Sequence, residues 1–320
     1  MRSARFHIRL LAPLLAAGVL ACASPAMAAL SCSFDVDDLD FGDVDLTQGA
    51  PYTVTGAVNS RCRGGLPFQW VTICPNIGSG TGNGTGHDPR QLDKYGSSTE
   101  KLNFNLYQHG SSTIWGSFLW PFPERPPVIR IRLDFSGAGS NTTLIDARLF
   151  GGQNAHTKGT YISRFRNGHI AFQYLTGYRS DCSGASRTKR PRFKVRARNV
   201  KSCTVSATDL DFGTVGALSS NVDTTSEVTV RCTYDLPYKI KLLGPNDATN
   251  RKMTHGSDEI TYGTYRDAAR SQPWGRFNSN DVDATGTGYD QQFTVYGRVP
   301  PQPTPPPGTY VDTITVRVTF

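Results

Sequence analysis

The sequence predicts an all-β protein built from two copies of one domain. The segment Ser31–Gly42 reappears as Ser202–Gly213, with a cysteine and an Asp-Leu-Asp-Phe-Gly run at the same spacing. An internal repeat of this kind indicates a duplicated unit of the fold. Glycine (32 residues) and proline (20) are abundant, and many segments alternate apolar with polar residues, which is typical of turn-rich β structure. A length of 320 residues also suits two domains of roughly 150 residues.

The repeat continues well beyond this segment. The further matches, in the same order in both copies, are Arg61-Cys62 with Arg231-Cys232, Trp115-Gly116 with Trp274-Gly275, and Gly159-Thr160-Tyr161 with Gly308-Thr309-Tyr310. One short match can arise by chance, whereas an ordered series indicates two copies of one domain. We therefore expect domains at residues 29–199 and 200–320, the first of them more diverged.

Residues 1–28 are expected to be a secretory signal peptide. Arg2, Arg5 and Arg9 form its charged region, residues 10–23 form an apolar run too short to span a bilayer, and Ala26-Met27-Ala28 is a small-residue cleavage signal. A lipoprotein signal ending before Cys22 is the alternative. No other stretch is long and apolar enough for a transmembrane segment. The chain is therefore expected to be exported.

Removal of the signal peptide leaves six of the seven cysteines. An even number of cysteines in an exported chain predicts disulfides formed in an oxidising compartment. Equivalent positions in the repeat, and the two cysteines then left over, predict the pairs Cys32–Cys62, Cys203–Cys232 and Cys74–Cys182. No CxxC motif or histidine cluster indicates a metal site, so no metal and no cofactor are expected.

Basic residues concentrate in residues 192–198, where arginine and lysine alternate with Phe193, Val195 and Ala197. A period of two predicts a strand with one solvated face, and this strand would close the first domain. Loss of the three signal-peptide arginines also lowers the net charge from +8 to about +5. A solvated strand face explains the basic run, so no nucleic-acid partner is expected.

The segment 114–123 is unusually rich in large apolar side chains. Phe118, Leu119, Trp120 and Phe122 lie between and beside prolines, which oppose a central strand. Such side chains either pack onto the core or are displayed for binding. We hypothesise that these four residues form a surface-binding loop, whereas Trp115, which the second copy shares, is expected to be structural.

Each copy resembles the spore coat protein U domain, the module of archaic chaperone–usher pilins. In the second copy the resemblance is carried by Cys203, Asp209–Gly213, Cys232, Arg251-Lys252-Met253, Tyr262, Trp274-Gly275, residues 294–299 and residues 308–313. The first copy matches at Cys32, Asp38–Gly42, Cys62 and Tyr107, and it diverges after Trp115.

The resemblance implies two immunoglobulin-like β-sandwich domains, the C-terminal one an incomplete pilin fold that lacks its last strand. A donor strand from the next pilin subunit would fill the open groove by β-strand addition. The residues expected at the groove edge belong to the last strand, residues 310–320, and are Tyr310, Ile314, Val316, Val318 and Phe320. A periplasmic pilus chaperone and an outer-membrane usher are the implied partners.

The N-terminal position of the first copy predicts the role of the subunit. Only residues 29–31 precede Cys32, and three residues span ~10 Å, too short for a donor strand. The chain is therefore expected at the pilus tip, as an adhesin that attaches to a host or abiotic surface and promotes biofilm formation. The alternative is a minor structural pilin or a spore-coat component without an adhesive role.

No enzymatic activity is expected. The five histidines of the mature chain lie in no HExxH motif, and the sequence has no GxSxG nucleophile turn. A secreted enzyme would need a catalytic cluster that only the fold could assemble.

Overall fold

The computed structural model describes residues 29–82, 88–97, 99–277 and 279–320. The expected signal peptide lies outside these residues. Within them, regular structure consists of 20 strands and two short 3-10 helices, η1 (Leu46–Gln48) and η2 (Asn167–His169). The prediction of an all-β protein is confirmed.

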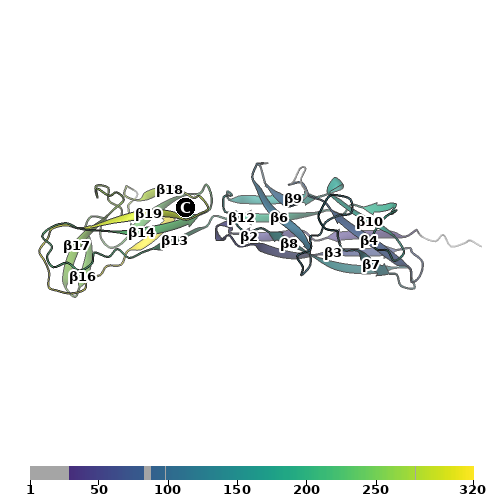
Figure 1. Ribbon diagram of the computed structural model, residues 1–320, viewed down its shortest axis with the longest axis horizontal. Helices are drawn as coiled ribbons and strands as arrows, with labels where there is room; N and C mark the ends of the chain where they lie inside the picture. Colours follow the sequence, from purple (N-terminus) through teal and green to yellow (C-terminus); the bar gives the residue numbers. More distant parts are fainter. Residues whose placement is uncertain (1–28, 83–87, 98, 278) are drawn as a thin grey trace, which may run out of the picture.

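The first domain is a sandwich of an eight-stranded and a four-stranded sheet (Figure 1). The larger sheet has the order β1-β3-β8-β6-β5-β9-β12-β2. Its strands are β1 (Ser31–Val36), β2 (Leu39–Val44), β3 (Tyr52–Arg63), β5 (Arg90–Lys94), β6 (Lys101–Gln108), β8 (Gly139–Leu149), β9 (Gly159–Phe165) and β12 (Phe193–Asn199). The smaller sheet has the order β11-β10-β4-β7, with strands β4 (Trp70–Ile77), β7 (Ile129–Arg132), β10 (Ile170–Thr176) and β11 (Arg187–Lys189).

Alternate side chains of these strands form the core between the two sheets. Phe104 from β6, Tyr161 from β9 and Phe172 from β10 are fully buried there, together with Trp115. Burial of a large apolar side chain contributes about 1.5–3 kcal/mol, so this core is a main source of the stability of the domain. The expectation that Trp115 is structural is confirmed.

The second domain has a five-stranded sheet of order β13-β14-β19-β17-β16 and a three-stranded sheet of order β18-β15-β20. The strands are β13 (Cys203–Ala207), β14 (Val222–Cys232), β15 (Pro237–Leu243), β16 (Arg251–His255), β17 (Asp258–Tyr265), β18 (Val282–Thr285), β19 (Gln291–Val299) and β20 (Thr315–Thr319). The predicted strand over residues 310–320 is therefore shorter than expected. Its first part makes only a single bridge, between Val311 and Thr254.

The three predicted disulfides are present: Cys32–Cys62, Cys74–Cys182 and Cys203–Cys232. The first and third join directly opposite residues of neighbouring strands, β1–β3 and β13–β14, with Cα atoms 4.0 and 4.1 Å apart. The two copies of the repeat therefore share the same cross-strand link. The second disulfide ties β4 to the loop before β11 and belongs to the first domain alone.

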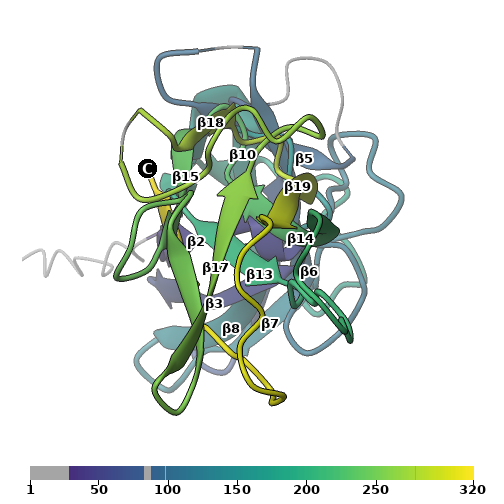
Figure 2. The same cartoon turned by 90° about the vertical axis from the view of Figure 1, so that its left-hand side faces the viewer.

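The two domains lie end to end, and the view down the long axis superimposes one on the other (Figures 1 and 2). Residues 200–202 link β12 to β13. Across the junction, the Ser202 hydroxyl donates to Asp45 Oδ2 at 2.7 Å, and Arg231 Nη1 donates to the Thr47 carbonyl at 3.3 Å. Thr157 and Tyr234 form a parallel bridge. The junction is thus held by polar contacts from both domains.

Each domain also buries one arginine at the start of an equivalent strand. Arg90 of β5 donates to the carbonyls of Ile77, Gly78 and Trp115 at 2.8 Å and to Asn105 Oδ1 at 2.6 Å. Burial lowers the pKa of Arg90 to about 9, so the guanidinium stays charged at neutral pH. Arg251 of β16 donates in the same way to the Leu242 carbonyl and to Thr264 Oγ1. Both arginines therefore donate hydrogen bonds to buried backbone carbonyls at the end of a strand or in the adjoining loop.

Replacement of Arg90 by methionine should therefore destabilise the first domain. Methionine keeps much of the volume but leaves three buried carbonyls without a donor, at a total cost of about 3 kcal/mol or more. Chemical denaturation would measure this loss. The control is Arg192→Met, at an exposed position, where we expect a change within about 0.5 kcal/mol. Equal stability of the two variants would contradict the structural role of Arg90.

Candidate functional site

The larger sheet of the first domain is completed by the last strand of that domain, β12, which lies between β9 and β2. This strand runs antiparallel to β9, with Ala197 opposite Tyr161, and parallel to β2, with Val195 opposite Leu39. Phe193, Val195 and Ala197 are buried, and the residues between them are exposed. The prediction of a half-solvated strand that closes the domain is confirmed.

The solvated face of β12 carries a row of ion pairs to the acidic segment beside it. The pairs are Lys194–Asp38, Arg196–Asp40 and Arg198–Asp43. The hydrogen bond from Arg196 lowers the pKa of the Asp40 carboxyl below its ordinary value, and that from Arg198 does the same for Asp43. The basic run therefore neutralises the acidic run of the same domain, which explains both.

The equivalent edge of the second domain is open. The repeat equates Leu39 with Leu210 and Tyr161 with Tyr310, so the counterpart of β12 would lie between these two residues. In the described residues no strand lies there, and residues 209–213 belong to no sheet. A groove of about 640 Å³ lies between the two segments. Its apolar lining includes Leu210, Phe212, Leu218, Val222, Met253, Ile260 and Tyr310.

Of the five residues expected at this edge, Tyr310 lines the groove and the other four do not. Ile314, Val316 and Val318 are half-buried against the core of the second domain, and Tyr310 lines the groove. Phe320 is exposed by 51% and lies in a separate hollow beside Pro237. Phe320 follows β20, whose last paired residue, Thr319, lies opposite Lys239 of β15, and its place at the groove edge stays a prediction.

The insert at residues 118–122 is only partly displayed. Leu119 is exposed by 47%, whereas Phe118 and Trp120 are half-buried. Phe122 is buried, with its ring 4.2 Å from the Arg90 guanidinium. The hypothesis of a binding surface is therefore wrong for Phe122. A buried cation nearby holds this ring inside the domain, and the sequence gives no sign of that contact.

An exposed cluster of aromatic and aliphatic side chains lies instead on three neighbouring loops of the first domain. We call it the aromatic surface, and its residues are Leu66, Phe68, Trp70, Phe135 and Tyr178. The loops follow or precede β3, β4, β7 and β10, at the end of the first domain farthest from the second (Figure 1). The Trp70 and Tyr178 rings make an edge contact at 5.2 Å. Arg130 and Arg132 lie over the rings of Tyr178 and Phe68.

The alternation of the sequence around Phe68 does not distinguish a strand from a turn, so the sequence gives no sign of this surface. In the structure β4 begins only at Trp70, and Phe68 lies in a turn with a φ of 60°. The sequence repeat aligns Leu66 and Phe68 with Leu236 and Tyr238 of the second copy, which are each only 3% exposed, and Tyr238 lies within β15. The aligned residues differ in exposure because Phe68 lies in the turn before β4, whereas Tyr238 is part of β15 and packs into the core of the second domain.

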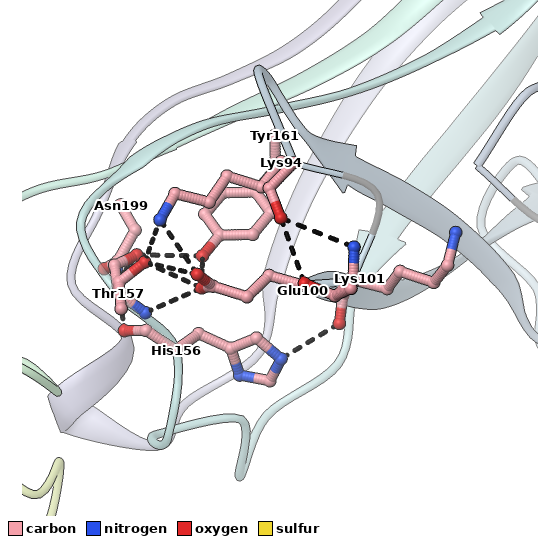
Figure 3. Close-up of polar contacts among 9 residues, drawn as sticks. Lys94, Glu100, Lys101, His156, Thr157, Tyr161 and Asn199 are labelled. Carbon is pink, nitrogen blue, oxygen red and sulfur yellow. Dashed lines mark hydrogen bonds and ion pairs between the residues drawn. The ribbon is translucent and has the colours of Figure 1, made fainter.

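A polar network fixes the end of β12 next to the junction (Figure 3). The Glu100 carboxylate accepts hydrogen bonds from Lys94 Nζ at 2.9 Å, Tyr161 OH at 2.9 Å and Thr157. Asn199, the last residue of β12, donates to the carbonyl of Thr157 at 3.1 Å. Burial alone would raise the pKa of Glu100, but these hydrogen bonds outweigh it and lower the pKa to about 2. The network therefore needs an ionised Glu100.

The described residues contain no group of three or more histidine, cysteine, aspartate or glutamate side chains arranged to hold a metal ion. Likewise, no helix in the described part of the chain is long and apolar enough to cross a membrane.

A family model of the Spore Coat Protein U domain matches residues 19–165 and again residues 191–317. The chain belongs to the Spore Coat Protein U domain family. Each copy of the repeat thus corresponds to one family domain, as the sequence resemblance implied. No curated protein matches the chain.

One solved structure supports the fold. The chain is similar to one in the CsuC–CsuE chaperone–tip adhesion subunit pre-assembly complex, from archaic chaperone–usher Csu pili of Acinetobacter baumannii. The identity is 14% and the TM-score 0.54, over 91% of this chain and 100% of that one. The CupB6 tip adhesin from Pseudomonas aeruginosa matches over 91% of this chain and 95% of its own, at 14% identity and a TM-score of 0.36. The first likeness shows that this Spore Coat Protein U protein has the immunoglobulin-like fold of pilus subunits.

The Glu100 network predicts a specific loss of stability in acid. Because the folded pKa of about 2 lies below the ordinary value of about 4.5, the contribution is complete above pH 4.5 and disappears as the pH falls towards 2. Glu100→Gln should lower the free energy of unfolding by about 2 kcal/mol at pH 7 and by much less near pH 2. Denaturant titrations across this pH range would measure the difference. Glu227→Gln is the control, and a pH-independent difference for Glu100→Gln would contradict the assignment.

Proposed function

We propose that this chain is the tip subunit, or adhesin, of a chaperone–usher pilus, and that it mediates attachment and biofilm formation. Its second domain would be joined to the fibre by the donor strand of the next pilin subunit. The single observation that carries the proposal is β12, which occupies in the first domain the position that is open in the second. The first domain thus displays, within one chain, the contact that the second would make with a neighbour.

The physical reason is the cost of an open edge over an apolar core. Leu210, Phe212 and Ile314 are only partly buried, and the backbone along residues 209–213 is unpaired by any strand of the described chain. An alternating segment would supply three apolar side chains in place of Phe193, Val195 and Ala197; burial contributes about 1.5–3 kcal/mol for a side chain the size of Val or Phe and about 0.8 kcal/mol for the Ala methyl. It would also pair the exposed backbone of the edge.

The same exposed edge accounts for the proposed partners. Until assembly, an open apolar groove favours aggregation, so a periplasmic chaperone would have to cover it, and an outer-membrane usher would exchange that chaperone for the donor. The similar Csu chain comes from a complex of a chaperone with a tip adhesion subunit. We infer export through the periplasm to the cell surface.

The direction of β12 supports a position at the fibre end. Asn199 lies opposite Gly159, and from there the chain passes into the second domain. By the same geometry a donor strand would leave the groove beside Gly308, the counterpart of Gly159. Gly308 contacts His255 of β16, at the end of the second domain that points away from the first (Figure 1). The next subunit would then continue outward from that end, leaving the first domain free.

The aromatic surface is the contact region that we propose for a host or abiotic surface. It lies at the end of the molecule opposite β16 and β17 (Figure 1), and it displays five large apolar side chains. Exposed apolar clusters of this kind typically mark interaction sites. Leu119 and the half-buried Phe118 and Trp120 offer a second apolar region on the same domain.

A donor segment fused to the chain should stabilise the second domain. We would append after Phe320 a flexible linker of about 12 residues, followed by a copy of residues 193–199. The copy should fill the groove, raise the thermal midpoint of the second domain by about 10 °C or more, and abolish binding of an apolar dye. The control carries the same seven residues in scrambled order. If both fusions behave like the unmodified chain, the groove is not a donor site.

Loss of the aromatic surface should impair adhesion without impairing assembly. Phe135→Ser together with Tyr178→Ser removes two of the most exposed rings, and we expect adhesion of piliated cells to fall about fivefold or more. Tyr95→Ser, at an exposed tyrosine outside the surface, is the matched control. Immunogold labelling should find the wild type and both variants at fibre ends. Labelling along the fibre or on a spore would favour a minor pilin or a spore-coat component.

A further inference from the structure

The two copies of the acidic segment have the same geometry but different partners. In the first, Asp40 uses Oδ1 to accept from Gly42 N at 3.0 Å and Oδ2 to accept from Arg196 Nε at 3.1 Å. In the second, Asp211 Oδ1 accepts from Gly213 N at 2.8 Å, so the same turn is already formed. No ion pair to Asp211 or to Asp209 occurs within the described residues. The second copy therefore presents the same carboxylate geometry without an ion-pair partner among the described residues.

The strand register identifies where that partner would lie. In the first domain Val195 is opposite Leu39, and its neighbours Lys194 and Arg196 pair with Asp38 and Asp40. The repeat equates these three residues of the acidic segment with Asp209, Leu210 and Asp211. A strand filling the second groove in the same register would set one apolar residue against Leu210. Its two flanking side chains would point to solvent beside Asp209 and Asp211.

The third ion pair of the first domain has no counterpart in the second. Asp43, which pairs with Arg198, corresponds to Thr214. A donor strand would therefore need no charged residue at the position equivalent to Arg198. Only the positions equivalent to Lys194 and Arg196 would face an aspartate of the second domain.

We propose that the donor strand of the second domain carries a lysine or arginine on each side of its central apolar residue, and that Asp209 and Asp211 select it through these two cations. Opposite charges on adjacent strands favour one register, while like charges directly opposite disfavour pairing. The apolar residues would supply most of the docking strength, because ion pairs on a solvated face are individually weak. The two aspartates would thus act chiefly on the choice of subunit and on its register. This inference rests on the proposed function, since it specifies the partner of the same groove.

Three versions of the fused donor test the proposal. All carry the copy of residues 193–199 after the linker, and all keep the same apolar residues. The first is unchanged, the second contains Lys194→Gln and Arg196→Gln in the copy only, and the third contains Lys194→Glu and Arg196→Glu in the copy only. We expect the thermal midpoint to fall in this order, with about 5 °C or more between the first and third in 50 mM salt. The difference should shrink by about half or more in 500 mM salt.

Charge reversal in the groove provides the decisive comparison. With Asp209→Lys and Asp211→Lys in the second domain, the fusion that carries Lys194→Glu and Arg196→Glu in its copy should have a higher thermal midpoint than the fusion with the unchanged copy. The control is Asp235→Asn, which removes one negative charge at an exposed position outside the groove. Asp235 has a positive φ, which asparagine also tolerates, so this variant should leave the order of thermal midpoints among the three fusions unchanged. Equal stabilisation by all three copies would overturn the inference and leave the proposed function intact. Stabilisation by none of them would overturn both.

Discussion

The structure depends on one constraint: a sheet edge above an apolar core must be paired. In the first domain β12 meets this constraint within the chain, burying Phe193, Val195 and Ala197 between β9 and β2. In the second domain the corresponding edge has half-buried apolar residues and a groove instead of a strand. The two domains therefore share one fold, but only the first contains a strand at this edge. The first domain pairs its edge within the chain, whereas the edge of the second is open to a strand from another subunit.

Polar contacts set the geometry around these two edges. The buried guanidinium groups of Arg90 and Arg251 satisfy carbonyls at the same place in each copy, so both domains keep the same frame around the edge strand. The Glu100 network holds Asn199, from which the chain passes directly to the second domain. The end of β12 is thereby fixed to the body of the first domain, and the junction contacts of Asp45 and Thr47 follow from it.

The relation between the two domains offers a physical picture of the fibre that we propose. β12 completes one domain and then leads into the next, which is what a donor strand would do between subunits. Under this proposal the chain has one open end, at the second domain, and one closed end, where the aromatic surface lies. Attachment and assembly would then use opposite ends of the molecule. The Asp209–Asp211 pair would add selectivity to a contact whose strength is mainly apolar.

The sequence by itself determined the features that depend on local pattern or on the repeat. Alternation predicted β12 with its buried and solvated faces. The matched copies predicted Cys32–Cys62, Cys203–Cys232 and the structural role of Trp115, and the two remaining cysteines then predicted Cys74–Cys182. Only the tertiary structure decided which apolar loop residues are displayed. Phe122 is buried with its ring against the Arg90 guanidinium, while Phe68 is exposed in the turn before β4 and the aligned Tyr238 is buried within β15. Exposure depends on what each loop packs against, and residues distant in the chain set that environment.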